Sequence, residues 1–145
     1  MADQPKNPLD NNRGRRTVTL KLAEDLFVET DGSTTYIDLV LPTVLTDVGY
    51  YVEDVTIHAY LPERSGDAFQ YRVVMEYSFD KLKWEDIDPP LLNDVNSLGY
   101  KISEPFDSRD ELGRHLRFVL GVCNSQAGSA VSGRISLQAA IRFWS

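Results

Sequence analysis

Apolar and polar residues alternate in two long stretches near the end of the chain. In residues 114–122 and again in residues 133–144, every second residue is apolar. Successive side chains of a β-strand point to opposite faces, so each apolar set lines one side of a sheet. The two sets are Leu116, Phe118, Leu120 and Val122, and Ile135, Leu137, Ala139, Ile141 and Phe143. They predict two long strands, antiparallel neighbours at the floor of a sandwich core, joined by a loop at residues 123–130.

The same alternation recurs through the first half of the chain. Further strands are predicted at residues 17–22, with a bend at 23–25 and a continuation at 26–28, and at residues 36–41, 50–61 and 69–77. Polar turns separate them at residues 30–33 and 62–67, and Pro42 ends the strand before it. Seven or eight such strands predict an all-β protein, an antiparallel β-sandwich of the jelly-roll type.

Residues 79–113 have a different pattern. Pro89 and Pro90 and the largely polar residues 93–97 break regular alternation, so a long irregular loop is expected, with a short strand at residues 100–102. Residues 108–113 are typical of one helical turn, with Ser108 as the N-cap and Gly113 as the stop. Long irregular loops in compact domains often carry function or an interaction surface.

The first 14 residues contain two prolines and almost nothing apolar. They predict a flexible arm that precedes one sandwich domain at residues 15–145. The arm is either a loose terminus or a segment that orders on a neighbouring subunit. Arg13, Arg15 and Arg16 lie close together at its end and are suited to an acidic partner.

Composition narrows the classes of function. The net charge is −7, and the first 16 residues hold more basic than acidic side chains, so the body of the chain is acidic. An acidic body disfavours nucleic acid as a partner. A single cysteine excludes an internal disulfide and a cysteine-rich zinc site. The N-terminus has no hydrophobic signal region, and no apolar run approaches about 18 residues, so we expect cytoplasmic synthesis and no membrane contact.

No catalytic motif stands out. Cys123 has His58 and His115 as possible bases, but nothing in their spacing brings them together. The carboxylates Glu85, Asp86 and Asp88 flank a predicted loop, where such groups are more often solvated than catalytic. We therefore predict no enzymatic activity.

Calcium is the one cofactor that the sequence leaves open. Carboxylate and amide oxygens are its preferred ligands, and several lie in or near the long loop, although not with EF-hand spacing. These residues are Asp80, Asp86, Asp88, Asn93 and Asp94.

Aromatic residues at predicted strand ends or in loops are candidates for recognition: Trp84, Tyr50, Tyr51, Tyr100 and Trp144. An exposed ring offers a flat apolar surface to a sugar or a protein, although each ring could instead pack over the end of the sandwich. Trp144 has the opposite phase to Phe143, so it lies off the predicted core face.

Residues 77–84, Tyr-Ser-Phe-Asp-Lys-Leu-Lys-Trp, followed by residues 113–118, Gly-Arg-His-Leu-Arg-Phe, resemble the pattern of discoidin-type (factor V/VIII C-type) β-sandwiches. The resemblance covers about residues 70–122. Phe79 and His115 depart from the family pattern, and its frequent cysteine pair is absent. The resemblance implies a sandwich fold and glycan binding, but no individual ligand residue transfers.

Two functions follow. The first is a structural subunit that self-associates or docks in a multi-subunit particle or shell, because exposed sheet edges favour association and closed symmetry is common. Its interaction residues would be Arg13, Arg15, Arg16, Trp144, Tyr50 and Tyr51. The alternative is a carbohydrate- or ligand-binding module, with Trp84 and Tyr100 as the wall of the site and Asp80 and Asp86 as its hydrogen-bonding groups.

Overall fold

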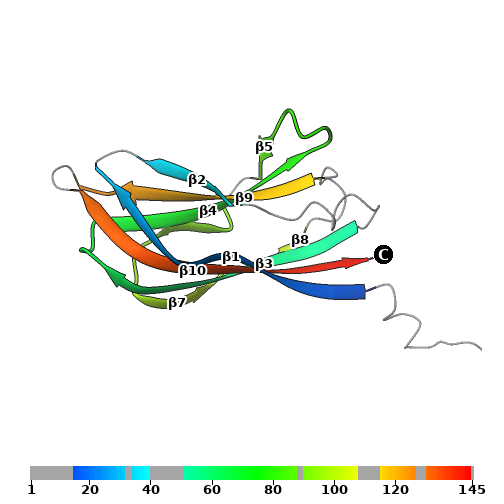
Figure 1. Cartoon of the computed structure of the whole chain (residues 1–145). Helices are drawn as coiled ribbons and strands as arrows, with labels where there is room; N and C mark the ends of the chain where they lie inside the picture. Colours follow the sequence, from blue (N-terminus) through cyan, green and yellow to red (C-terminus); the bar gives the residue numbers. More distant parts are fainter. Residues whose placement is uncertain are drawn as a thin grey trace, which may run out of the picture.

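The computed structural model describes residues 15–31, 34–39, 51–87, 90–107, 115–126 and 130–144. Within these ranges the chain forms strands and no helix, so no membrane-spanning helix occurs there. The strands form two antiparallel sheets stacked as a sandwich (Figure 1). The first sheet contains β1 (Arg15–Thr30), β10 (Val131–Trp144), β3 (Tyr51–Arg64), β7 (Gly99–Ile102) and β8 (Phe106–Asp107). The second contains β2 (Thr35–Leu39), β9 (His115–Asn124), β4 (Phe69–Ser78), β5 (Glu85–Asp86) and β6 (Leu92–Val95).

The order of the strands is that of a jelly roll. The first sheet runs β1-β10-β3-β7, with β8 also beside β3, and the second runs β2-β9-β4-β5, with β6 beside β4. The first four strands alternate between the two sheets, as do β9 and β10. The predicted all-β, antiparallel sandwich is therefore confirmed.

One prediction about the sheet is wrong. The strands at residues 114–122 and 133–144 were expected to be neighbours, but β9 pairs with β2 and β4, whereas β10 pairs with β1 and β3. The alternation of side chains determines which face of a strand is buried and leaves its partner open. The connection from Ser125 crosses from one sheet to the other, and the backbone N–H of Ser125 donates to the carbonyl of Ala68 at 2.8 Å. Both strands thereby gain partners on each side.

The inner faces are those that the alternation predicts. The following predicted inner residues are buried: Leu116, Phe118, Leu120, Val122, Ile135, Leu137, Ala139 and Ile141. So are Val55, Ile57, Ala59, Leu61, Phe69, Tyr71, Val73 and Met75 of β3 and β4. Gly133 faces the same core, and a Cβ there would lie 3.0 Å from the Phe69 ring of the opposite sheet. A glycine at this position allows the two sheets to approach closely.

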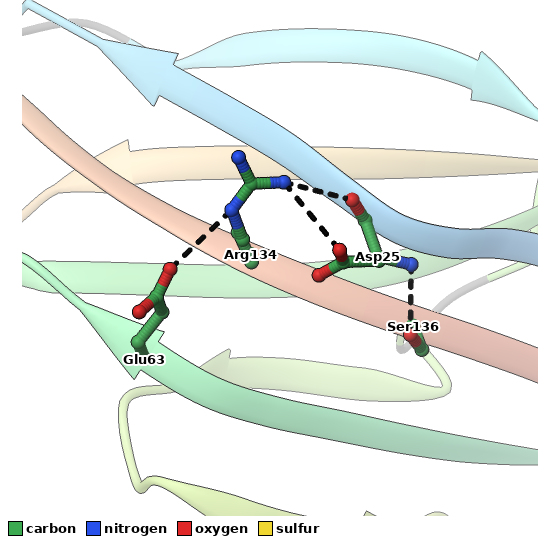
Figure 2. A network of polar contacts seen from close by, with 4 residues as sticks. All are labelled: Asp25, Glu63, Arg134 and Ser136. Carbon is green, nitrogen blue, oxygen red and sulfur yellow. Dashed lines mark hydrogen bonds and ion pairs between the residues drawn. The ribbon is translucent and has the colours of Figure 1, made fainter.

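The predicted bend at residues 23–25 is a bulge within β1, which is one continuous strand at an edge of the first sheet. Its pairing with β10 shifts between Lys21 and Leu26, and Asp25 has a φ of 48°. Figure 2 shows how the bulge is held: Arg134 donates to the Asp25 carbonyl at 3.2 Å, and the Asp25 N–H donates to the Ser136 hydroxyl at 2.9 Å. Arg134 also pairs with Glu63 of β3 at 3.3 Å, so one guanidinium joins three strands.

The segment at residues 79–113 is more regular than predicted. The expected short strand at 100–102 is confirmed as β7, but β5, β6 and β8 were missed. Residues 93–95 were expected to break the pattern, yet they lie in β6, where Leu92 and Val95 are buried. Strands of two to four residues are too short to show a period of two. The predicted arm at residues 1–14 and the helical turn at 108–113 lie outside the described residues.

Ser103 lies between β7 and β8 and continues their hydrogen bonding to β3. Its buried hydroxyl accepts the Ile57 N–H at 2.8 Å, and its own N–H donates to the Ile57 carbonyl at 2.9 Å. Ser103→Ala should lower the free energy of unfolding by about 1–3 kcal/mol, because the buried Ile57 N–H loses its acceptor. Chemical denaturation measures this. Ala at the exposed Ser97 is the control and should change the free energy by less than about 0.5 kcal/mol; equal effects at both positions would contradict the assignment.

The left-handed backbone at Asp25 gives a second prediction. Asp25→Val should destabilise the protein by about 1–2 kcal/mol, since a β-branched side chain opposes this conformation. Asp25→Gly removes the same carboxylate but relieves the backbone, so thermal unfolding should place it well above the valine variant. If the two variants unfold alike, the exposed ion pair rather than the bulge sets the local stability.

Candidate interaction surfaces

A row of charged side chains crosses the outer face of the second sheet. Arg117, Glu76 and Asp86 lie opposite one another on β9, β4 and β5. The Arg117 Nε lies 2.5 Å from the Glu76 carboxylate, and the Arg117 guanidinium lies 4.3 Å from the centre of the Trp84 ring. Burial raises the pKa of Glu76, and a hydrogen bond with Asp86 raises it further, against the opposing effect of Arg117. Glu76 therefore holds a proton more readily than an ordinary glutamate.

The row borders a cavity of about 460 Å³, which we call the β4 concavity. It is lined by Tyr36, Arg72, Val74, Glu76, Asp86, Ile87, Pro90 and Val119. Gly121 of β9 lies between Tyr36 and Arg72 in the sheet. A Cβ at Gly121 would lie 2.9 Å from Arg72 Cγ and 3.2 Å from the Tyr36 ring, so this glycine gives both side chains room. Arg72 is held by an ion pair with Asp94 at 2.8 Å.

A tight turn follows β4 and carries two exposed apolar side chains. In this turn, residues 79–83, the Asp80 carboxylate accepts the N–H groups of Leu82 at 2.8 Å and Lys83 at 3.0 Å. These bonds lower the pKa of Asp80, with Lys83 as the largest contributor. Phe79 is 68% exposed and Leu82 is 83% exposed. We call residues 79–83 the apolar tip.

The outer face of the first sheet carries an aromatic pair. The rings of Tyr60 on β3 and Tyr100 on β7 stack with centroids 4.4 Å apart. Tyr100 is 80% exposed, and the pair borders a shallow concavity of about 320 Å³ that also includes His58 and Gln138. This surface is on the opposite side of the sandwich from the β4 concavity.

The structure separates Tyr100 from the other three residues of the predicted ligand site. Asp80, Trp84 and Asp86 lie in and near the strand end that carries the apolar tip, whereas Tyr100 lies on the outer face of the other sheet. Trp84 is half-buried beneath Arg117, and Asp80 organises its own turn. Tyr100 and Trp84 therefore do not form the two sides of one pocket.

Four of the six predicted interaction residues lie at one end of the first sheet. Arg15 of β1 pairs with Trp144 of β10, which pairs in turn with Tyr51 of β3, and Arg16 is next to Arg15. The side chains of these four residues, and the whole of Arg13 and Tyr50, lie outside the described part of the structure.

Cys123, His58 and His115 lie apart. His58 is on the first sheet, whereas Cys123 and His115 are at opposite ends of β9, eight residues or about 26 Å apart. The Cys123 sulfur lies 3.2 Å from the Thr34 hydroxyl. Of the predicted calcium ligands, Asp88 is outside the described ranges, and within those ranges no three His, Cys, Asp or Glu side chains cluster as a metal site requires.

Sequence reasoning missed the β4 concavity and the apolar tip. Two signals could have indicated them: a glycine in the middle of the apolar strand β9, and the Ser78-Phe79-Asp80 sequence, in which side-chain oxygens stabilise a turn. Tyr36, Arg72 and Gly121 are far apart in the sequence, so only strand pairing brings them together.

No family model and no curated protein matches this chain. Among solved structures, it is similar to a chain in the structure of infectious bursal disease virus Gx strain, at 14% identity and a TM-score of 0.59. It is also similar to a chain in the crystal structure of the infectious bursal disease virus VP2 subviral particle, at 14% identity and a TM-score of 0.55. Each match covers 88% of this chain but 32% of the other, so the chain spans about a third of their length. The likeness shows a shared fold.

The charged row generates a prediction about protonation. Asp86→Asn should lower the pKa of Glu76, because it removes the negative neighbour that favours the protonated form. A raised pKa means that the contribution of Glu76 to stability is full in acid and falls as the pH rises through that pKa. The variant should therefore gain more stability at pH 7 than at pH 4. Titration of the Glu76 carboxyl carbon by NMR measures the change, Asp67→Asn is the control, and an unchanged pKa would contradict the coupling.

Proposed function

We propose that this protein is a non-catalytic structural subunit that associates with copies of itself in a particle or shell. The observation that carries the proposal is the sandwich shared, over 88% of the chain, with a protein of infectious bursal disease virus that forms a subviral particle. The identity of 14% supports only the fold, so the assembly role is inferred from the surface as well.

Both outer faces of the sandwich carry features suited to neighbours. Large exposed apolar residues occur on the two sheets and their loops: Phe27, Tyr36, Phe79, Leu82, Leu98, Tyr100 and Ile102. Single exposed apolar residues are ordinary on monomers. Here, however, Tyr60 and Tyr100 form a stacked pair on one face, and Phe79 and Leu82 share one rigid turn beside the other. Contact surfaces on opposite sides suit a subunit with more than one neighbour.

A passive role also agrees with the placement of the reactive side chains. Cys123 bonds to Thr34, and both histidines lie too far from it for proton transfer. Glu76 is paired with Arg117 and shares a hydrogen bond with Asp86. These contacts support structural roles for side chains that an enzyme would use in catalysis.

The proposal predicts concentration-dependent self-association. Size-exclusion chromatography with light scattering should detect species larger than the 16.4 kDa monomer as the protein concentration rises. A variant that begins at residue 15 tests the arm: loss of association assigns the arm to the contact, and unchanged association assigns the contact to the sandwich. Monomers from both proteins at the highest attainable concentration would contradict the proposal.

A further inference from the structure

The apolar tip has the properties of a preformed docking element. It rises from the end of β4 above the outer face of the second sheet (Figure 1). Its backbone is fixed locally: the Ser78 hydroxyl accepts the Lys81 N–H at 2.8 Å, and Asp80 accepts two more N–H groups. A rigid turn loses little conformational freedom on binding, so its exposed Phe79 and Leu82 can contribute almost fully to an interface.

The base of the tip is also closed. The Tyr77 hydroxyl donates to the Glu85 carboxylate at 2.6 Å, and the Phe79 ring packs edge-on to the Tyr77 ring at a centroid distance of 6.1 Å. These contacts connect the two strands that flank the turn. The tip therefore presents Leu82 and the free side of Phe79 in one orientation.

The charge of the tip selects its partner. Lys81 and Lys83 flank Leu82, and both are exposed, whereas the whole chain has a net charge of −7. Two copies of an acidic protein repel unless a basic element of one meets an acidic surface of the other. A second copy of this chain, with its net charge of −7, supplies acidic side chains for this contact.

The β4 concavity complements the tip in chemistry. It is about 460 Å³ in volume, and Val74, Ile87 and Val119 provide apolar lining for Phe79 and Leu82. Asp86 provides negative charge on the same surface for the lysines, whereas Glu76 is already paired with Arg117. It adjoins β4 and β5, the strands that also carry the tip, so the tip and the concavity face the same side of the sandwich.

We infer that the apolar tip of one copy seats in the β4 concavity of a second copy, and that the second copy returns the same contact. This pairing of two second-sheet faces is isologous, so every contact occurs twice about a two-fold axis. The inference rests on the proposed assembly function and names the surface through which the first association occurs.

The first experiment removes the apolar side chains of the tip. Leu82→Ser and Phe79→Ser should each weaken dimerisation by about 100-fold or more in sedimentation equilibrium, because a central apolar residue is lost twice per dimer. Leu82 is 83% exposed, so circular dichroism and the melting temperature of Leu82→Ser should match those of the parent protein, whereas Phe79→Ser also loses the ring contact with Tyr77. Leu98→Ser, at an apolar residue that is 53% exposed outside the tip, is the control and should leave the dimer intact.

The second experiment tests the pairing of charges. Lys81→Glu with Lys83→Glu should weaken the dimer, Asp86→Arg should weaken it as well, and the combination should restore association toward that of the parent. Raising the salt concentration should weaken only proteins whose charges are complementary.

The outcomes separate the inference from the proposal on which it rests. If the parent protein oligomerises and the Leu82→Ser and Phe79→Ser variants oligomerise equally well, the inference is overturned and the assembly function stands. A parent protein that stays monomeric overturns both. Monomers that instead sediment with phosphatidylserine vesicles in a Leu82-dependent manner would assign the tip to a lipid surface and overturn the second-copy contact.

Discussion

The burial of two facing apolar surfaces determines the rest of this structure. Apolar side chains from every long strand point inward at alternate positions, and the two sheets pack on them. β9 and β10 are interior strands of their sheets, and Phe69 packs against Gly133 from the opposite side. Because the interior is filled, recognition is confined to the outer faces, the loops and the edges.

The sequence predicts the fold to the extent that local periodicity encodes it. Residues such as Phe118 and Leu137 were correctly assigned to the core, since strand geometry alone puts every second residue on one face. The partner of each strand is not local information, so the expected pairing of the last two strands was wrong. β6 escaped detection because its two buried residues, Leu92 and Val95, are three positions apart and so do not show the period of two.

The candidate surfaces divide in the same way. Asp80, Trp84 and Asp86 lie near one another because they are neighbours in the sequence, whereas Tyr100, predicted to share their site, belongs to the other sheet. Gly121 has no evident role in the sequence alone. Its role becomes clear only when β2 and β4 place Tyr36 and Arg72 on either side of it.

The bulge at Asp25 limits how the edge of the first sheet can pair with another molecule. β1 is the outermost strand of its sheet, and an uninterrupted strand of 16 residues would offer a continuous template for backbone pairing with another molecule. The left-handed residue and the two shifts of register divide that template into shorter pieces that differ in direction. Backbone pairing between the sheets of two molecules, the route to fibrils, is thereby disfavoured at this edge.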